Sequence, residues 1–129
     1  MYKELIISII IVAIIIIGDC LTQKYTEKCV SDLTDKMRNL KQEMMNISPN
    51  DDDIKNKANE IYDIWNECHD KLAYYIEHDE LEKVETDFTS CKSFIENKEY
   101  PFAVSEIDKT IFVLDHISDK YAFNLQNIF

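Results

Sequence analysis

Glycine occurs once and proline twice in this chain of 129 residues, and that shortage restricts the folds open to it. Tight turns, phosphate-binding loops and β-hairpins depend on these two residues, because other residues adopt the required backbone angles only at a cost. The chain therefore favours long helices joined by short connections. Its length allows one domain with a modest core. The sequence predicts an all-α protein.

An uncharged apolar stretch, LIISIIIVAIIIIG from Leu5 to Gly18, lies near the start of the sequence. It makes roughly 21 Å of helix, and the flanking Tyr2 and Lys3 extend it towards the roughly 30 Å of a bilayer core. We predict a transmembrane anchor over residues 1–21. A cleaved signal peptide has an apolar core of the same length, and a buried helix of a soluble protein is the third alternative.

The residues beside this stretch give conflicting signals about its orientation. Lys24, Lys28, Lys36 and Arg38 follow it, and basic residues after a span argue for a cytoplasmic domain. The short leader before it instead resembles a signal-anchor, and the acidity of the following domain disfavours a position beside an anionic leaflet. We expect a single-pass protein of the cell membrane, in contact with lipid through its N-terminal helix, with the C-terminal domain outside the cytoplasm.

Apolar residues recur at alternating spacings of three and four through residues 22–129, which is typical of amphipathic helices. The pattern occupies four segments, which are Val30 to Ile47, Ile54 to Tyr75, Leu81 to Ile95 and Val104 to Leu114. Short connections make sequential helices antiparallel neighbours. We therefore predict that the transmembrane helix continues into an antiparallel bundle of about four helices. An unpaired apolar seam on the first helix would also allow a homodimer.

Polar residues between these segments predict where the helices begin. Ser48 is expected to cap the second helix and Asp79 the third, and the fourth helix begins near Tyr100. Phe112 and Ile117 are expected to widen the apolar face of the fourth helix. The last segment, SDKYAFNLQNIF, is weakly patterned, and we expect it to fold back on the bundle, with a partner-binding tail as the alternative.

Cysteine, histidine and acidic residues gather in residues 65–80, WNECHDKLAYYIEHDE. Ten helical residues, about 15 Å, separate Cys68 from His78, so an unbroken helix cannot place both on one metal ion. Continuing the seam beyond Tyr75 would also bury acidic residues. We interpret this stretch as the end of one helix and the start of the next.

Counting along the predicted helices places Cys29, Cys68 and Cys91 at one level of the bundle, with His69 nearby. Thiolates with one imidazole suit zinc or other soft ions, so these four residues are the candidate metal ligands. Two alternatives remain open. Buried cysteines often serve as small apolar residues, and Cys68 could form a disulfide with Cys91 in an exported domain.

The composition disfavours enzymes and nucleic-acid-binding proteins. The sequence contains no glycine-rich phosphate loop, nucleophile elbow or H-E-x-x-H motif, so we predict no catalytic site and no cofactor. Its 25 acidic and 14 basic residues give a formal net charge of -11, which would repel a phosphate backbone. We predict that the protein does not bind nucleic acid.

Several short motifs together resemble one family. They are the helix with Trp65, YIEHDELEKVE over residues 75–85, CKSFIE over 91–96, HISDK over 116–120 and the final NIF. With the isoleucine-rich N-terminal stretch, they are similar to the DUF4363 family of Firmicute proteins, a domain of unknown function. The resemblance implies a small single-span membrane protein with a membrane partner, and it supplies no catalytic or binding residues.

These observations support a binding or scaffolding protein that engages another membrane or envelope protein. The apolar residues left over once the helical seams close would form its contact surface, and the candidates are Tyr62, Tyr74 and Phe129. The alternative function is a redox-sensing or metal-sensing domain that uses the cysteines and His69.

Overall fold

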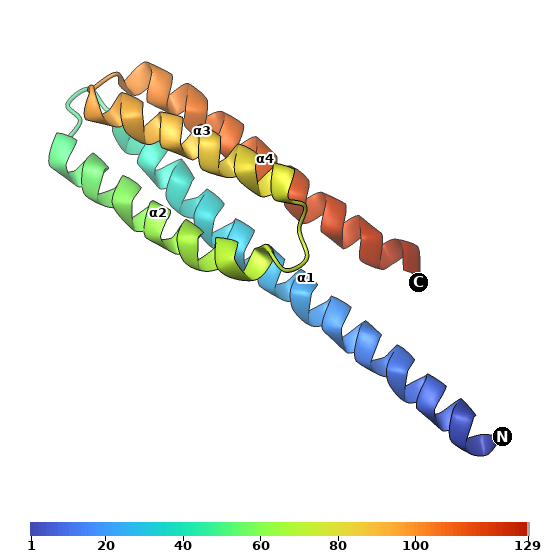
Figure 1. Ribbon diagram of the computed structural model, residues 1–129. Helices are drawn as coiled ribbons and strands as arrows, with labels where there is room; N and C mark the ends of the chain where they lie inside the picture. Colours follow the sequence, from blue (N-terminus) through green and yellow to red (C-terminus); the bar gives the residue numbers. More distant parts are fainter. Residues whose placement is uncertain (129) are drawn as a thin grey trace.

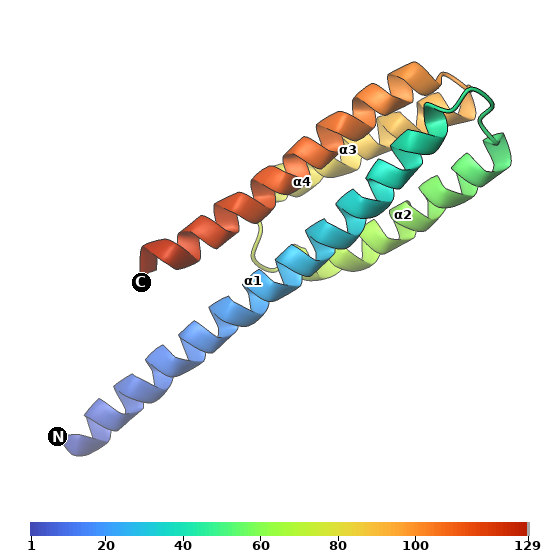
Figure 2. The same cartoon turned by 180° about the vertical axis from the view of Figure 1, so that it is seen from behind.

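The computed structural model describes the backbone of residues 1–128 and the side chains of residues 1–122. This part of the chain forms four helices, α1 (Tyr2–Met44), α2 (Asp51–Leu72), α3 (His78–Glu96) and α4 (Tyr100–Ile128). Figures 1 and 2 show each helix antiparallel to the next in an up-and-down bundle. The predicted all-α antiparallel bundle, continuous with the N-terminal helix, is confirmed.

Helix α1 is much longer than the bundle. Its contacts with the rest of the bundle begin at Thr22, whose carbonyl accepts a hydrogen bond from Tyr75, and residues 2–21 project from one end as uninterrupted helix (Figure 1). At 1.5 Å per residue, the projecting part is about 30 Å long. We call the end of the bundle from which α1 projects the proximal end. The opposite end, with the α1–α2 and α3–α4 turns, is the distal end.

The core follows the predicted seams of α1, α2 and α3. Its largest fully buried side chains are those of Trp65, Phe88, Leu33, Met37, Leu40, Ile54, Ile61, Leu72, Leu81, Ile107, Leu114 and Ile117. Ile47 is an exception, since α1 ends at Met44 and leaves Ile47 fully exposed in the turn.

The seam of α4 differs from the prediction. Ala103 and Thr110 are buried with Ile107, whereas Val104 and Ile111 lie half-buried at its edge. The small side chains of Ala103 and Thr110 let α4 approach its neighbours closely. The buried Thr110 hydroxyl donates a hydrogen bond to the Glu106 carbonyl, 2.8 Å away. Phe112 does not widen the buried face, because its ring is 74% exposed.

Two of the predicted helix starts are displaced. Asn50 caps α2 in place of Ser48, since its side-chain oxygen accepts a hydrogen bond from the Asp53 amide at 3.1 Å. Helix α3 begins at His78, one residue before the predicted cap Asp79, and no side chain caps it.

The predicted start of α4 at Tyr100 is confirmed, and the turn before it has Schellman geometry. The Glu99 amide donates to the Phe94 carbonyl at 2.9 Å, and the Lys98 amide donates to the Ile95 carbonyl at 3.0 Å. Lys98 occupies the left-handed position, with φ 58°, that glycine usually fills. This turn therefore holds a lysine in a backbone conformation that disfavours side chains.

Lys98→Gly is expected to raise the free energy of unfolding by about 0.5–1 kcal/mol, because glycine adopts this conformation without a steric cost. The substitution also removes an exposed ion pair between the Lys98 ammonium and Asp51, at 3.2 Å, which contributes little. Urea unfolding followed by circular dichroism measures the change. Lys98→Ala removes the same charge and keeps the strained conformation, so a gain of equal size in this control would contradict the explanation.

The C-terminal segment does not turn back on the bundle. Helix α4 continues to Ile128 and projects from the proximal end in the same direction as the start of α1 (Figures 1 and 2). A straight continuation is possible because nothing in SDKYAFNLQNIF breaks a helix.

Candidate functional site

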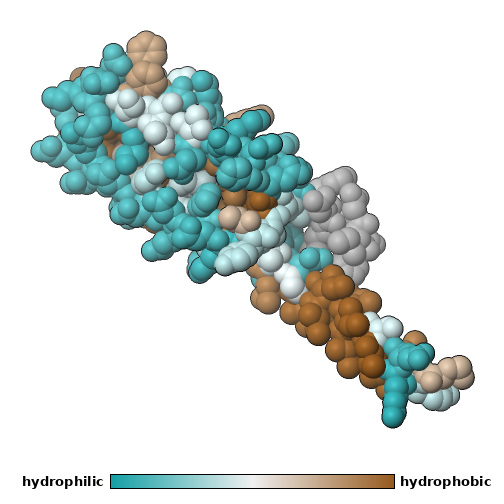
Figure 3. Space-filling model, in the orientation of Figure 1, coloured by the Kyte–Doolittle hydropathy of each residue, from teal (hydrophilic) through white to brown (hydrophobic). Residues whose placement is uncertain are grey.

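The projecting part of α1 carries a continuous apolar surface, seen in brown in Figure 3. Leu5, Ile9, Ile10, Ile11, Val12, Ile14, Ile15 and Ile17 are each more than half exposed. None of the residues in this stretch is buried in the described part of the chain. Within the described chain, α1 is the one helix whose length and composition would allow it to cross a membrane. Membrane anchors and N-terminal signal sequences share these properties.

The α2–α3 turn, residues 73–77, lies at the proximal end and is held there by α1 and α4. The Tyr75 hydroxyl donates to the Thr22 carbonyl at 3.1 Å and shares a 2.7 Å hydrogen bond with the Thr26 hydroxyl. The Glu77 amide donates to the Tyr121 hydroxyl at 3.1 Å. Burial raises the pKa of Tyr75. Residues 65–80 therefore form a helix end, a clamped turn and a helix start, as predicted.

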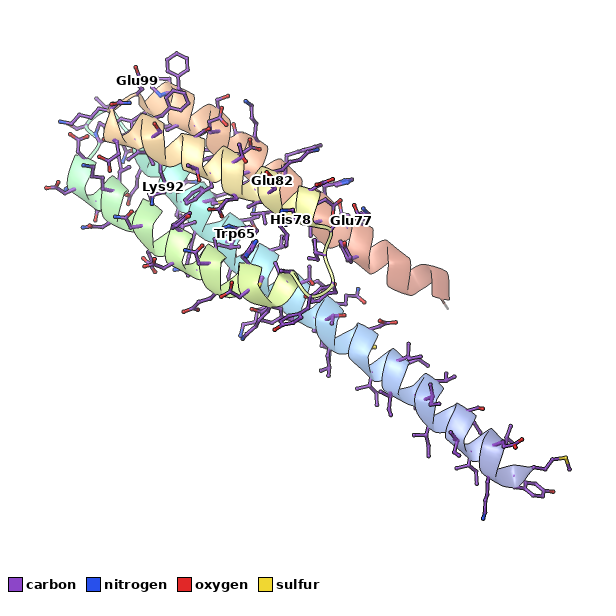
Figure 4. The ribbon with its side chains drawn as sticks, viewed as in Figure 1. Trp65, Glu77, His78, Glu82, Lys92 and Glu99 are labelled. Carbon is purple, nitrogen blue, oxygen red and sulfur yellow. The ribbon has the colours of Figure 1, made fainter. Side chains whose placement is uncertain are left out.

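A polar cluster links α2 to α3 above this turn, where the two helices pack less closely than the other neighbouring pairs. Glu85 accepts hydrogen bonds from the Trp65 indole N–H at 2.5 Å and from the Tyr62 hydroxyl at 2.7 Å. The Tyr62 ring stacks on the ring of Phe88. The Lys92 ammonium lies 4.2 Å from the centre of the Tyr62 ring. Figure 4 places Trp65 and Lys92 on these facing helices. One carboxylate of α3 thus accepts hydrogen bonds from two aromatic side chains of α2.

Cys29 of α1 and Cys68 of α2 meet inside the bundle, with their sulfur atoms 2.6 Å apart. Cys91 of α3 is also buried, and the charge of Glu106 of α4 contributes to raising the pKa of its thiol. His69 is half-buried and packs edge-on against the ring of Trp65, at 5.6 Å between centroids. Two of the four candidate metal ligands therefore meet, and Cys68 contacts Cys29 where the sequence suggested Cys91 as its disulfide partner.

Among the residues with described side chains, no three His, Cys, Asp or Glu lie close enough together to hold a metal ion. The similar level of Cys68 and Cys91 along the bundle is not sufficient to bring their thiols into contact. The thiol of Cys68 faces α1, which packs more closely against α2 than α3 does.

The two thiols in contact have very different acidities. The hydrogen bond from Cys68 stabilises the thiolate of Cys29 and lowers its pKa to about 7, aided by a hydrogen bond from Tyr25 and by the charge of Lys71. The same contact and burial raise the pKa of Cys68. Burial raises the pKa of Cys91 to about 12. Among the three buried thiols, Cys29 is therefore the one whose thiolate is stabilised, whereas burial disfavours the thiolate of Cys91.

The family model for a domain of unknown function, DUF4363, matches residues 20–128. The chain belongs to the DUF4363 family. The match begins where the apolar stretch of α1 ends, and it covers the whole bundle. No curated protein and no solved structure matches the chain.

The three predicted contact residues of this DUF4363 chain have different environments. Tyr74 is 90% exposed in the α2–α3 turn. Tyr62 is half-buried, and both its ring and its hydroxyl are engaged within the bundle. Phe129 lies outside the described residues. Tyr74 is thus the candidate with a free aromatic surface.

Two residues that contact the candidate site residues of this DUF4363 bundle were not identified from the sequence. Tyr25 lies one helical turn before Cys29, and a spacing of four residues could have placed it beside that thiol. Glu85 gave no comparable signal, because its role depends on how α3 is rotated towards α2.

Proposed function

We propose that this protein is a membrane-anchored bundle that binds another membrane or envelope protein outside the cytoplasm. The observation that carries the proposal is the uncovered apolar part of α1. Four consecutive residues, Ile9 to Val12, are each more than half exposed, so the apolar surface runs around the whole helix. Lipid covers a helix on all sides, whereas one partner helix would cover one stripe. The projecting length of about 30 Å matches the roughly 30 Å bilayer core.

Anchoring by α1 sets the proximal end of the bundle at the membrane surface and leaves the distal end in water. Tyr74 lies at the proximal end with its ring free. Tyrosine suits this region because its ring is apolar and its hydroxyl can stay hydrated. A shared membrane also raises the effective concentration of the two proteins, so a small contact can suffice. The partner contact is accordingly assigned to the α2–α3 turn.

An orientation outside the cytoplasm is supported by the acidity of the chain. A formal net charge of -11 is disfavoured beside the anionic cytoplasmic leaflet. We therefore assign the cell membrane as the location, with a single span and an exported C-terminal domain.

The test uses Tyr74→Cys in a Cys20→Ser background, with a membrane-impermeant photoreactive maleimide applied to intact cells. Cys29, Cys68 and Cys91 are buried and should not react, so the label reports residue 74 alone. We expect labelling without permeabilisation and, on illumination, one discrete cross-linked product that contains a second membrane or envelope protein.

Ile47→Cys in the same background is the matched control, because Ile47 is equally exposed at the distal end. It should take up the label and give no discrete product. If neither variant is labelled until cells are permeabilised, the orientation is wrong. If both are labelled and Tyr74→Cys gives no product, the contact site is wrong.

A further inference from the structure

We propose that Cys29 and Cys68 form a disulfide that links α2 covalently to the helix that carries the anchor. Their sulfur atoms are 2.6 Å apart, and the side chains are only 4% and 6% exposed. The two residues belong to different helices and lie 39 positions apart in the chain. This inference concerns the internal chemistry of the bundle and does not depend on the partner contact.

The fold already places the two sulfur atoms in the required positions. A disulfide needs an S–S distance of about 2.05 Å, so the sulfur atoms must approach by roughly half an ångström. The direct contact shows that no other side chain separates the thiols. Only this short approach separates the contact from the S–S bond length.

The surroundings favour reaction at Cys29. The Lys71 ammonium lies 5.2 Å from the centre of the Tyr25 ring, one turn from Cys29. A nearby cation and hydrogen-bond donors stabilise a thiolate, which is the nucleophile in thiol–disulfide exchange. The pKa of Cys29 is about 7, so neutral pH supplies this thiolate. Cys91, whose pKa is raised to about 12, has no comparable activation.

The oxidant is a disulfide, either a small molecule or a protein. The Cys29 thiolate attacks one sulfur of that disulfide, forms a mixed disulfide and releases the first oxidant thiolate. That thiolate accepts the proton of Cys68. The Cys68 thiolate then attacks the sulfur of Cys29 and releases the second oxidant thiolate, which retains the electrons of the broken bond. Two electrons thus pass to the oxidant, which ends as two thiols once it takes up the remaining proton.

Access to the pair requires local opening. Both sulfur atoms are covered in the closed bundle, so an external disulfide reaches Cys29 only when the last turn of α2 separates from α1. That end of α2 leads into the turn clamped by Tyr75. Once formed, the bond ties this end of α2 to α1, and α2 is a helix that packs only loosely against its other neighbour, α3.

The experiment uses the full chain with Cys20→Ser, purified in detergent micelles and equilibrated with either oxidised or reduced glutathione. Three cysteines then remain of the four in the sequence. After denaturation and alkylation, the oxidised sample should carry one alkyl group and the reduced sample three. Peptide mass analysis should identify a Cys29–Cys68 link. The oxidised form should melt on the order of 10–20 °C higher, a difference that dithiothreitol removes.

Cys91→Ser is the control that should retain both the link and the melting difference, and Cys29→Ala should lose both. Three alkyl groups after oxidation, or a Cys68–Cys91 link, would overturn the proposal. The mass analysis needs neither of these two variants, so it stands even if one fails to fold. The purified sample contains no partner protein, so this result and that of the cellular cross-linking fail or succeed separately.

Discussion

Replacement of Trp65 by alanine is expected to lower the free energy of unfolding by about 3–5 kcal/mol. The indole is fully buried at the middle of the α2 seam, so its removal leaves a cavity between helices. It also removes one of the two hydrogen bonds that Glu85 accepts from α2. A domain of this size has about 5–15 kcal/mol of stability. Thermal or urea unfolding in detergent, followed by circular dichroism, measures the loss.

Two further variants separate the causes of this effect. Trp65→Phe keeps most of the buried ring and removes the indole N–H, so its cost measures mainly the hydrogen bond to Glu85. Tyr74→Ala truncates an exposed aromatic residue and should change the stability by less than about 0.5 kcal/mol. If Trp65→Ala cost no more than Tyr74→Ala, the described core would be wrong.

The paired substitutions Ile10→Asp and Ile14→Asp are expected to release the protein from membranes. Both side chains are more than half exposed in the middle of the apolar segment. Each aspartate at the centre of a span costs about 2.5–3.5 kcal/mol on insertion. Together they shift the insertion equilibrium by about 10⁴-fold or more, since 1.4 kcal/mol corresponds to a factor of ten. Alkaline extraction of membranes measures the change, and the wild-type chain should stay in the pellet.

The matched control is Met45→Asp with Ile47→Asp, which adds the same charge at exposed apolar residues of the distal end. This variant should remain in the pellet. Retention of the Ile10→Asp and Ile14→Asp variant after alkaline extraction would argue that the bundle, and not the apolar segment, binds the membrane. Intact mass of the pelleted wild-type chain distinguishes a retained anchor from a cleaved signal sequence.

The helices were predictable because an apolar spacing of three and four residues has few structural solutions. The seams from Val30 and Ile54 led directly to the buried faces of α1 and α2. The seam of α4 was predicted correctly at Ile107 and Leu114. Ala103 and Thr110 were missed because they carry little hydrophobic signal, although close helix packing selects such small residues. Helix ends were harder to predict, since Asn50 and Ser48 are nearly equal as caps.

The level of each site residue along its helix was predictable from the sequence, but the direction of its side chain around the helix axis was not. Counting residues placed Cys29 and Cys68 at one level, and the structure confirms that these two meet. The same count wrongly included Cys91. Counting residues gives the level of a cysteine along the bundle, but it does not reveal which neighbouring helix the side chain contacts. Tyr62 was predicted to be left over outside the seams for the same reason, whereas its hydroxyl donates a hydrogen bond to Glu85 of the next helix.

The continuity of α1 has a mechanical consequence. It is one helix from Tyr2 to Met44, without proline, and its single glycine, Gly18, precedes the bundle. Helices bend sharply at proline, at glycine or at local defects, so the part between Leu21 and Met44 behaves as a stiff rod. A change in the tilt of this rod swings the distal turns through a much larger arc than its base, and Gly18 is the position at which the apolar segment can bend relative to the rod.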